Sequence, residues 1–393
     1  MSAKKILIIA GVLLTLIGGT LLVYNFFFKN QTATENPETS GSLPQTSNSL
    51  ATPLPGQTQN PTGSTTVNQT NLKIKPISQE KVFGATIGVD GQTVKYYSRF
   101  NGQVYQSAFD GSGLKKISAT TLNGLIKVLW SPDKEKIISV FSDNNQTKKY
   151  FYDYGSGQNS RLNANVGYVA WSPDSKKIAY QFTSAASEQS NISISDPDGT
   201  NWKNIFKTRL DNLIVEWPSK EKISIRTQVS GLSQSLLYVI DSATGDFTKI
   251  LSDIYGLNVL WSPKADKILY SKTDSRGRSP ALILADETGI NSQDPKLAGL
   301  VDKCVWSKDD RTIFCALPQE FSENAVWPDD YYKGLVILAD DFYKINLETG
   351  EKTKIIGSTA QFGYDAQNLF LSPKEDYLFF TNRSDGLLYS LKI

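Results

Sequence analysis

A short phrase centred on tryptophan recurs along the chain. It reads Trp-Ser-Pro-Asp at residues 130–133 and 171–174, and weaker forms begin at Trp217, Trp261, Trp306 and Leu371. Ile87 opens the series, and successive anchors lie 41 to 46 residues apart, except for 65 residues before the last. A period in the forties, with short apolar runs beside each anchor, is typical of a β-propeller. Seven anchors therefore predict an all-β propeller of seven blades.

One repeat, residues 125–163, shows why the period fits a blade. Residues 125–130 are apolar on both faces apart from Lys127, as expected for a strand that is covered on both sides. A serine, a proline and an aspartate then favour a tight turn. Residues 137–141, 149–154 and 159–162 are suited to three further strands. Four strands in each repeat is the composition of a propeller blade.

The last repeat contains only enough strand-forming sequence for three strands. Residues 377–381 and 387–391 are suited to its second and third strands, and the chain stops at Ile393. Residues 72–77 precede the first blade and alternate lysine with apolar side chains, which suits an outer strand with one wet face. We expect this segment to complete the last blade and so to close the ring, which removes an open sheet edge.

The repeated phrase, followed by a lysine-bearing turn and a β-branched strand, resembles the TolB-type family of WD-like propellers. The resemblance covers residues 72–393. It implies a propeller domain over these residues and specifies no particular ligand.

The segment before the propeller has two parts. Residues 6–28 are uncharged, and as a helix they would extend about 34 Å, enough for a hydrocarbon core of about 30 Å. Lys4 and Lys5 precede them, which places the N-terminus in the cytoplasm and the propeller outside. A cleaved signal peptide is the alternative, although its apolar core is normally shorter. Residues 31–71, rich in Thr, Ser, Asn, Gln and Pro, predict a disordered linker.

The chain is thus expected to have three regions: a cytoplasmic tip with a transmembrane helix (1–30), the linker (31–71) and the propeller (72–393). This makes it a single-pass membrane protein whose propeller is periplasmic or at the cell surface. Its contact with the membrane is made by residues 6–28.

The composition excludes several kinds of site. The chain has no histidine, which removes Ser-His-Asp and Cys-His catalysis and every histidine-ligated metal site. We expect neither a cofactor nor a metal. The 41 basic and 39 acidic residues nearly balance and form no basic block, so a nucleic-acid partner is not expected. Cys304 and Cys315 are the only cysteines; a hairpin centred on residues 309–310 would pair them, and both the disulfide and free thiols stay open.

The long interval before Leu371 points to a candidate binding face. The extra residues lie between the second strand, near 312–317, and the third, near 342–347. In a propeller this loop opens on the same face as the loop into the next blade. The two loops carry the candidate residues Phe321, Trp327, Asp329, Asp330, Tyr331, Tyr332, Phe362, Tyr364 and Asp365. Exposed aromatics with an acidic rim suit sugar rings or a partner's pocket. Alternatively, the insertion is a lid or spacer that packs its own aromatics.

These features favour a non-catalytic binding or scaffold module for a protein or an envelope polymer such as a polysaccharide. Whether the chain is an enzyme stays open. Glycan hydrolases or lyases that use carboxylates do not require histidine, and a cluster of two acids and an arginine at the channel mouth would mark one. A structural spacer without a ligand is the third possibility.

Overall fold

The computed structural model describes residues 73–393, apart from residues 119, 145, 185–188 and 359–362. The expected anchor at 6–28, the expected linker at 31–71 and the candidate residue Phe362 therefore lie outside the described residues. Two short helices occur among the described residues, η2 (Val301–Lys303) and α2 (Asp329–Tyr332), and strands dominate the rest. Neither helix in this part of the chain is long and apolar enough to cross a bilayer.

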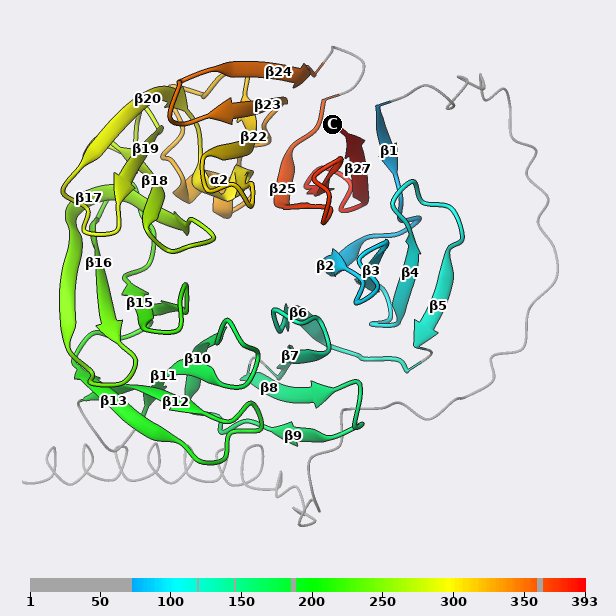
Figure 1. Ribbon diagram of the computed structural model, residues 1–393, viewed down its shortest axis with the longest axis vertical. Coiled ribbons are helices and arrows are strands. Elements are labelled where there is room, and N and C mark those ends of the chain that lie inside the picture. Colours follow the sequence, from blue (N-terminus) through cyan, green and yellow to red (C-terminus); the bar gives the residue numbers. More distant parts are fainter. Residues whose placement is uncertain (1–72, 119, 145, 185–188, 359–362) are drawn as a thin grey trace, which may run out of the picture. The chain divides into compact units, whose positions relative to one another are not determined.

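The strands form antiparallel sheets that follow one another around a common centre in chain order (Figure 1). Four of the sheets each consist of four consecutive strands. The first two are β2 (Val82–Ile87), β3 (Thr93–Ser98), β4 (Val104–Ala108) and β5 (Lys115–Ser118), then β6 (Leu125–Trp130), β7 (Lys136–Asp143), β8 (Gln146–Asp153) and β9 (Asn159–Arg161). The other two are β10 (Val166–Trp171), β11 (Ile178–Thr183), β12 (Ser190–Ser195) and β13 (Lys203–Thr208), then β21 (Cys304–Trp306), β22 (Thr312–Pro318), β23 (Asp340–Asn346) and β24 (Lys352–Ile356).

One larger sheet joins two four-stranded groups through a shared strand. Its strands, in order, are β14 (Ile214–Glu216), β15 (Lys222–Arg226), β16 (Gln234–Asp241), β17 (Phe247–Trp261), β18 (Lys267–Thr273), β19 (Ala281–Asp286) and β20 (Ser292–Ala298). The first part of β17 pairs with β16 and the last part with β18. Left-handed backbone at Asp253 and Gly256 lies between the two parts, which suits a strand that passes from one group to the next.

The recurring tryptophans connect successive sheets. The indole nitrogen of Trp130 donates to the carbonyl of Gly84, and that of Trp171 donates to the carbonyl of Leu129, at 2.6 and 3.0 Å. Trp306 does the same to Leu260 at 3.2 Å. In these three cases the acceptor is a backbone carbonyl in the strand one repeat earlier, whereas Trp261 donates to the Ser224 hydroxyl and Trp217 to the carbonyl of Lys220 in its own repeat. The propeller architecture predicted from the phrase is confirmed at this level.

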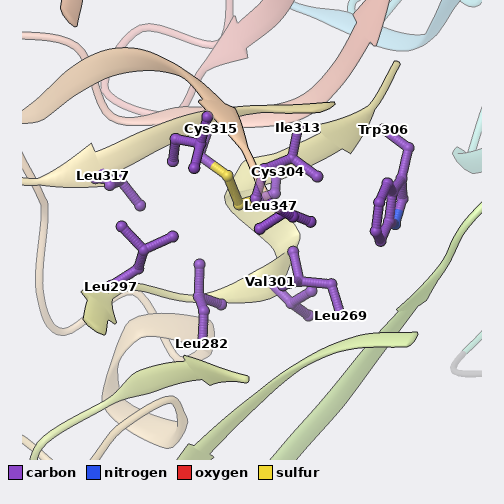
Figure 2. Close-up of a cluster of buried hydrophobic side chains, with 11 residues drawn as sticks. Leu269, Leu282, Leu297, Val301, Cys304, Trp306, Ile313, Cys315, Leu317 and Leu347 are labelled. Atoms are coloured by element: carbon purple, nitrogen blue, oxygen red, sulfur yellow. A yellow bond between two sulfur atoms is a disulfide. The ribbon is translucent and has the colours of Figure 1, made fainter. Parts of the chain in front are cut away.

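Apolar clusters fill the space between neighbouring sheets. In Figure 2, leucines from β18, β19 and β20 pack against Ile313 and Leu317 of β22. The first sheet packs on the last in the same way, because Val82, Val94 and Tyr96 lie against Phe379 and Leu388. Cys304 and Cys315 face each other across β21 and β22 and are joined by a disulfide, which Figure 2 shows within the same cluster.

The last sheet combines both ends of the described chain. Its strands are β25 (Ala366–Leu371), β26 (Tyr377–Asn382), β27 (Leu388–Lys392) and, outermost, β1 (Ile74–Pro76). Ile74 lies opposite Leu391, and Pro76 lies opposite Tyr389. The expected outer strand is therefore confirmed, although it is shorter than residues 72–77.

This pairing predicts the effect of two truncations. Deleting residues 1–71 should leave the melting temperature of the propeller unchanged, whereas deleting residues 1–78 should lower it by several degrees. The longer deletion removes Ile74 and Ile77, both buried, and each worth about 1.5–3 kcal/mol of burial. It also exposes the edge of β27. Thermal unfolding of the two proteins followed by circular dichroism is the measurement, and equal melting temperatures would contradict the prediction.

Candidate functional site

The insertion, residues 319–339, joins β22 to β23 and contains α2 (Figure 1). It forms a small core of its own around Trp327 and Tyr331, together with Leu300, Ala325, Leu338, Phe321 and Val336. Trp327 is 1% exposed and Tyr331 is 3% exposed. The expectation that these two aromatics are exposed is therefore wrong. The Trp327 ring packs between two other aromatics, with its centroid 4.8 Å from that of Phe321 and 6.4 Å from that of Tyr331.

The two acids that begin α2 fasten the insertion. Asp329 accepts hydrogen bonds from the Ser230 hydroxyl at 2.9 Å and from the Gly231 amide at 2.7 Å, both in the loop between β15 and β16. Asp330 accepts from the amide of Val326 at 2.7 Å, within the insertion. Both carboxylates therefore hold the insertion in place, and Asp329 joins it to a loop of the β14–β17 group, beyond the adjacent β17–β20 group.

Two further loops hold the insertion. The amide of Trp327 donates to the carbonyl of Gly277, in the loop between β18 and β19, at 2.8 Å. Arg383, in the loop between β26 and β27, lies 4.0 Å from the ring centre of Tyr331 and donates to its carbonyl. The insertion is thus a packed cap bound to the loops of three other strand groups.

Beneath the cap lies the Lys303 cluster, which consists of Lys303, Asp340 and Asp365, all fully buried. The Lys303 ammonium donates to Asp340 at 2.7 Å, to Asp365 at 2.6 Å and to the carbonyl of Ala366 at 3.0 Å. Asp365 also accepts from the Tyr331 hydroxyl at 2.7 Å. Asp365, expected on an exposed rim, is instead a buried part of this cluster, because Lys303 compensates its charge and the Tyr331 hydroxyl donates a hydrogen bond to it.

Burial and charge act in opposite directions on the Lys303 cluster. Burial raises the pKa of Asp340 to about 6, although the Lys303 charge and its hydrogen bond lower it. Burial alone would lower the pKa of Lys303, but the charges of Asp340, Tyr331 and Asp365 outweigh it, so that this pKa is raised. The cluster holds its lysine charged and its two carboxylates close to one cation.

The remaining candidate residues are distributed unevenly. Tyr364 is half-buried, with its ring centroid 5.6 Å from Phe380 and 5.3 Å from Tyr389. Phe321 is half-buried, and Tyr332, at 43%, is the most exposed of the candidate aromatics that the structure describes. The structure therefore brings the predicted loops together, but presents few of their side chains to a ligand.

A cavity of about 720 Å³ opens beside the insertion. The strands β19 and β20 and the loop between β18 and β19 form one side, and Phe321, Glu323 and Trp327 form the other. Three basic and three acidic side chains line it, namely Arg276, Arg278, Lys296, Asp274, Asp294 and Glu323. Its volume falls in the range of about 300–1,000 Å³ that is usual for ligand pockets. The balanced lining suits a neutral or mixed-charge ligand, such as a sugar chain or a protein segment.

A second polar group is assembled from five separate segments of the chain, and we call it the Arg226 group. It consists of Glu216 at the end of β14, Arg226 at the end of β15, Asn258 in β17, Asp302 in η2 and Tyr332 in α2. Asn258 donates to Asp302 and, at 3.2 Å, to the Tyr332 oxygen, while the Tyr332 hydroxyl donates to Asp302. Glu216 accepts from the Ser224 hydroxyl at 3.3 Å.

The Arg226 group is only partly enclosed, because Arg226 is buried and Glu216 half-buried, whereas Asp302 and Tyr332 are exposed. Burial raises the pKa of Glu216 and of Asp302, while the charge of Arg226 lowers both. Asp302 nevertheless keeps exposed surface, as expected for a side chain that protein surrounds but that solvent still reaches. Arg226 is 7% exposed, and its Nε and Nη1 have no hydrogen-bond partner in the described part of the chain.

Sequence reasoning missed this group except for Tyr332. Its members are separated by up to 116 positions and carry no shared motif. One signal was available, because Asp302 lies in a loop between two successive blades, and such loops open on the same face as the insertion. Two acids and an arginine are the combination expected of a carboxylate-using enzyme.

Comparisons with known proteins show the fold. No family model and no curated protein matches the sequence. Among solved structures, an oligogalacturonate lyase from Vibrio parahaemolyticus matches with a TM-score of 0.57 at 10% identity, over 83% of this chain and 95% of that one. The β-propeller domain of the trilobed protease from Pyrococcus furiosus matches with a TM-score of 0.51 at 12% identity, over 79% and 96%.

TolB from Acinetobacter baumannii is also among the matches, with a TM-score of 0.44 at 14% identity, over 66% of this chain and 60% of that one. The match to the Pyrococcus β-propeller domain confirms the expected propeller resemblance as one of fold. The Pyrococcus propeller is described as having an open velcro topology. In this chain, by contrast, β1 pairs with β27.

Proposed function

We propose that this protein is a non-catalytic binding or scaffold module that holds a protein or an envelope polymer in the cavity beside the insertion. The observation that carries the proposal is that cavity, of about 720 Å³, formed between a firmly bound insertion and the β19–β20 edge. Phe321 supplies an aromatic edge, and the balanced charges supply hydrogen bonds of both kinds. Because many contacts hold the insertion in place, this side of the cavity is preorganised, and less conformational entropy of the protein is lost when a ligand binds.

The proposal includes the number of blades and the attachment of the propeller to a membrane. The six sheets contain seven groups of strands when β17 is counted in both of its groups, and we interpret them as seven blades. Residues 6–28 anchor the chain in a membrane, with the propeller on the periplasmic or outer side, and residues 31–71 tether it. The uncharged run of residues 6–28 after Lys4 and Lys5 supports this part.

The cavity proposal is tested by capture from the native envelope. Arg276→Ala and Phe321→Ala should each weaken capture of cross-linked partners by roughly thirtyfold, the effect of losing a contact worth about 2 kcal/mol. Arg276 is exposed, so its loss should leave the melting temperature unchanged. Phe100→Ala, which alters an exposed phenylalanine outside the cavity, is the matched control. Wild-type capture by both cavity variants would refute the proposal.

A second candidate function is a carboxylate-using glycan hydrolase or lyase. The Arg226 group favours it, because two acids with raised pKa values stand near one arginine. A carboxyl group whose pKa is raised can hold a proton near neutral pH and deliver it to a leaving group. The likeness to an oligogalacturonate lyase is one of fold, and it leaves the substrate of this chain open.

Glycan cleavage separates the two functions. If the second holds, Glu216→Gln and Asp302→Asn should each reduce the release of new chain ends from polysaccharides by at least about a hundredfold. Glu351→Gln, an exposed carboxylate on another part of the propeller, should not. Unchanged melting temperatures would show that the loss is chemical. If wild-type protein cleaves no acidic or neutral polysaccharide, the second candidate fails and the binding function is unaffected.

A further inference from the structure

Arg226 presents an unusual chemical situation within the propeller. The side chain is more than nine-tenths buried, and two of its guanidinium nitrogens have no partner in the described residues. No salt bridge joins it to a carboxylate within that part of the chain, although its charge lowers the pKa of both Glu216 and Asp302. A buried charged donor without an acceptor is costly, so such groups call for a water, an ion or a ligand.

The surroundings hold Arg226 in position. Arg226 lies at the end of β15, where it pairs with Ile214 of β14 and Leu237 of β16. Two residues earlier, on the same face of the strand, the Ser224 hydroxyl accepts from the Trp261 indole at 3.1 Å. The guanidinium is therefore carried by a central strand whose neighbouring side chains are fixed by packing. This is the support that a recognition site needs.

We propose that Arg226 is the recognition residue of a binding site for a sugar acid, a ligand that carries one carboxylate together with hydroxyl groups. The planar guanidinium fork matches a carboxylate, which can accept two parallel hydrogen bonds from it. Asp302 and Tyr332 both have exposed surface, so the ligand enters from the side of the insertion.

The other members of the Arg226 group decide the class of ligand. Carboxyl, amide and phenol groups, as in Glu216, Asp302, Asn258 and Tyr332, bind hydroxyl groups as donors or acceptors. The one positive charge of Arg226 matches one negative charge when both acids are in the neutral form that their burial favours. A phosphate, which carries nearly two, would leave one charge uncompensated. Because burial favours the neutral forms of Glu216 and Asp302, their repulsion of a carboxylate is weaker.

The proposed binding site uses the same residues as the second candidate function. It does not depend on that function, because a ligand can bind without being cleaved. The two can fail separately. If glucuronate binds but no glycan is cleaved, the enzyme proposal fails and the site stands. If a glycan is cleaved but glucuronate does not bind, the site is wrong and the enzyme proposal stands.

Calorimetric titration of the full-length protein in detergent micelles tests the inference, with D-glucuronate, D-glucose and inorganic phosphate as probes. Glucuronate should bind at least tenfold more tightly than glucose and more tightly than phosphate. Arg226→Met should reduce glucuronate binding to the level of glucose. Arg226→Lys keeps the charge without the planar fork and should weaken binding at least tenfold. Arg161→Ala, an exposed arginine on β9, should bind as wild type does.

Circular dichroism checks the fold of each variant. If Arg226→Met does not fold, Arg226→Lys carries the test, because it leaves a cation beside Glu216 and Asp302. The proposal is overturned if glucuronate and glucose bind equally or not at all, or if folded Arg226 variants bind glucuronate as wild type does. Tighter binding of phosphate than of glucuronate would overturn it as well, because the site would then recognise another anion.

Discussion

Replacing Lys303 by methionine is expected to lower the free energy of unfolding by about 3–5 kcal/mol, because it leaves two buried carboxylates without their cation. Lys303 donates to both Asp340 and Asp365 and has no exposed surface. Methionine approximates the volume of the apolar stem of the lysine, so that lost packing contributes little. Chemical denaturation near pH 7.5 is the measurement, and a change below about 1 kcal/mol would show that the Lys303 cluster is not the buried ion group described here.

A matched control is the ion pair of Lys354 with Asp341, the residue that follows Asp340. Lys354 forms an ion pair with Asp341 at 2.6 Å, close to the distances at Lys303, but its own side chain is half-exposed. Lys354→Met should leave stability almost unchanged, because water screens such a pair. The comparison separates the effect of burial from that of the ion pair itself. Asp340→Asn in the Lys303→Met background should recover part of the loss, because it removes one of the uncompensated charges.

The same cluster predicts a pH dependence. The folded-state pKa of Asp340 is raised to about 6, above its ordinary value of 3.8. A raised pKa means that proton uptake by this group stabilises the fold: its contribution is fully present below about pH 4 and is lost as the pH rises through 6. Without Lys303 this pKa should rise further. The stability deficit of Lys303→Met should therefore be largest near pH 7.5 and shrink toward pH 5, and a constant deficit would contradict the assignment to Asp340.

The parts of the fold that follow a period could be predicted from the sequence. The tryptophan phrase marks positions where an indole contacts the preceding sheet in three of the repeats, as Trp171 does at Leu129, so that a shared contact accompanies the shared residue there. The outer strand β1 was also predictable, because a ring with a missing strand leaves an edge that residues 72–77 can pair. The passage of β17 between two strand groups was not predicted, since it depends on local backbone at Asp253 and Gly256.

The insertion could be located but not oriented. Its length identified it, whereas nothing in an aperiodic segment tells which aromatics face inward. Trp327 and Tyr331 turned inward because Leu300 and Lys303, contributed by another loop, provide an apolar contact and a charge beneath them. The Arg226 group was harder still to predict, because it is assembled from five separate segments and none of its residues belongs to a recognisable sequence motif.

Replacing Trp327 and Tyr331 together by alanine is expected to unfold the insertion rather than to remove a binding surface. Each substitution deletes a nearly fully buried aromatic, and such losses cost about 3–5 kcal/mol apiece. Trp327→Ala also removes the indole that donates to the carbonyl of Ser322 at 3.1 Å, and Tyr331→Ala removes the hydroxyl bound to Asp365. Because the insertion is a satellite of the propeller core, it should open first, while the sheets remain folded.

Limited proteolysis and hydrogen exchange distinguish this outcome from simple loss of a contact. In the double variant, trypsin should cleave rapidly at Lys333. The backbone amide at position 327, which donates to the carbonyl of Gly277 in wild type, should exchange faster. Leu335→Ala, at a side chain that is 70% exposed on the same insertion, should change stability by less than about 0.5 kcal/mol. If instead the double variant keeps wild-type protection and stability but no longer captures its partner, the two aromatics contact the ligand directly and the insertion is a binding loop rather than a packed cap.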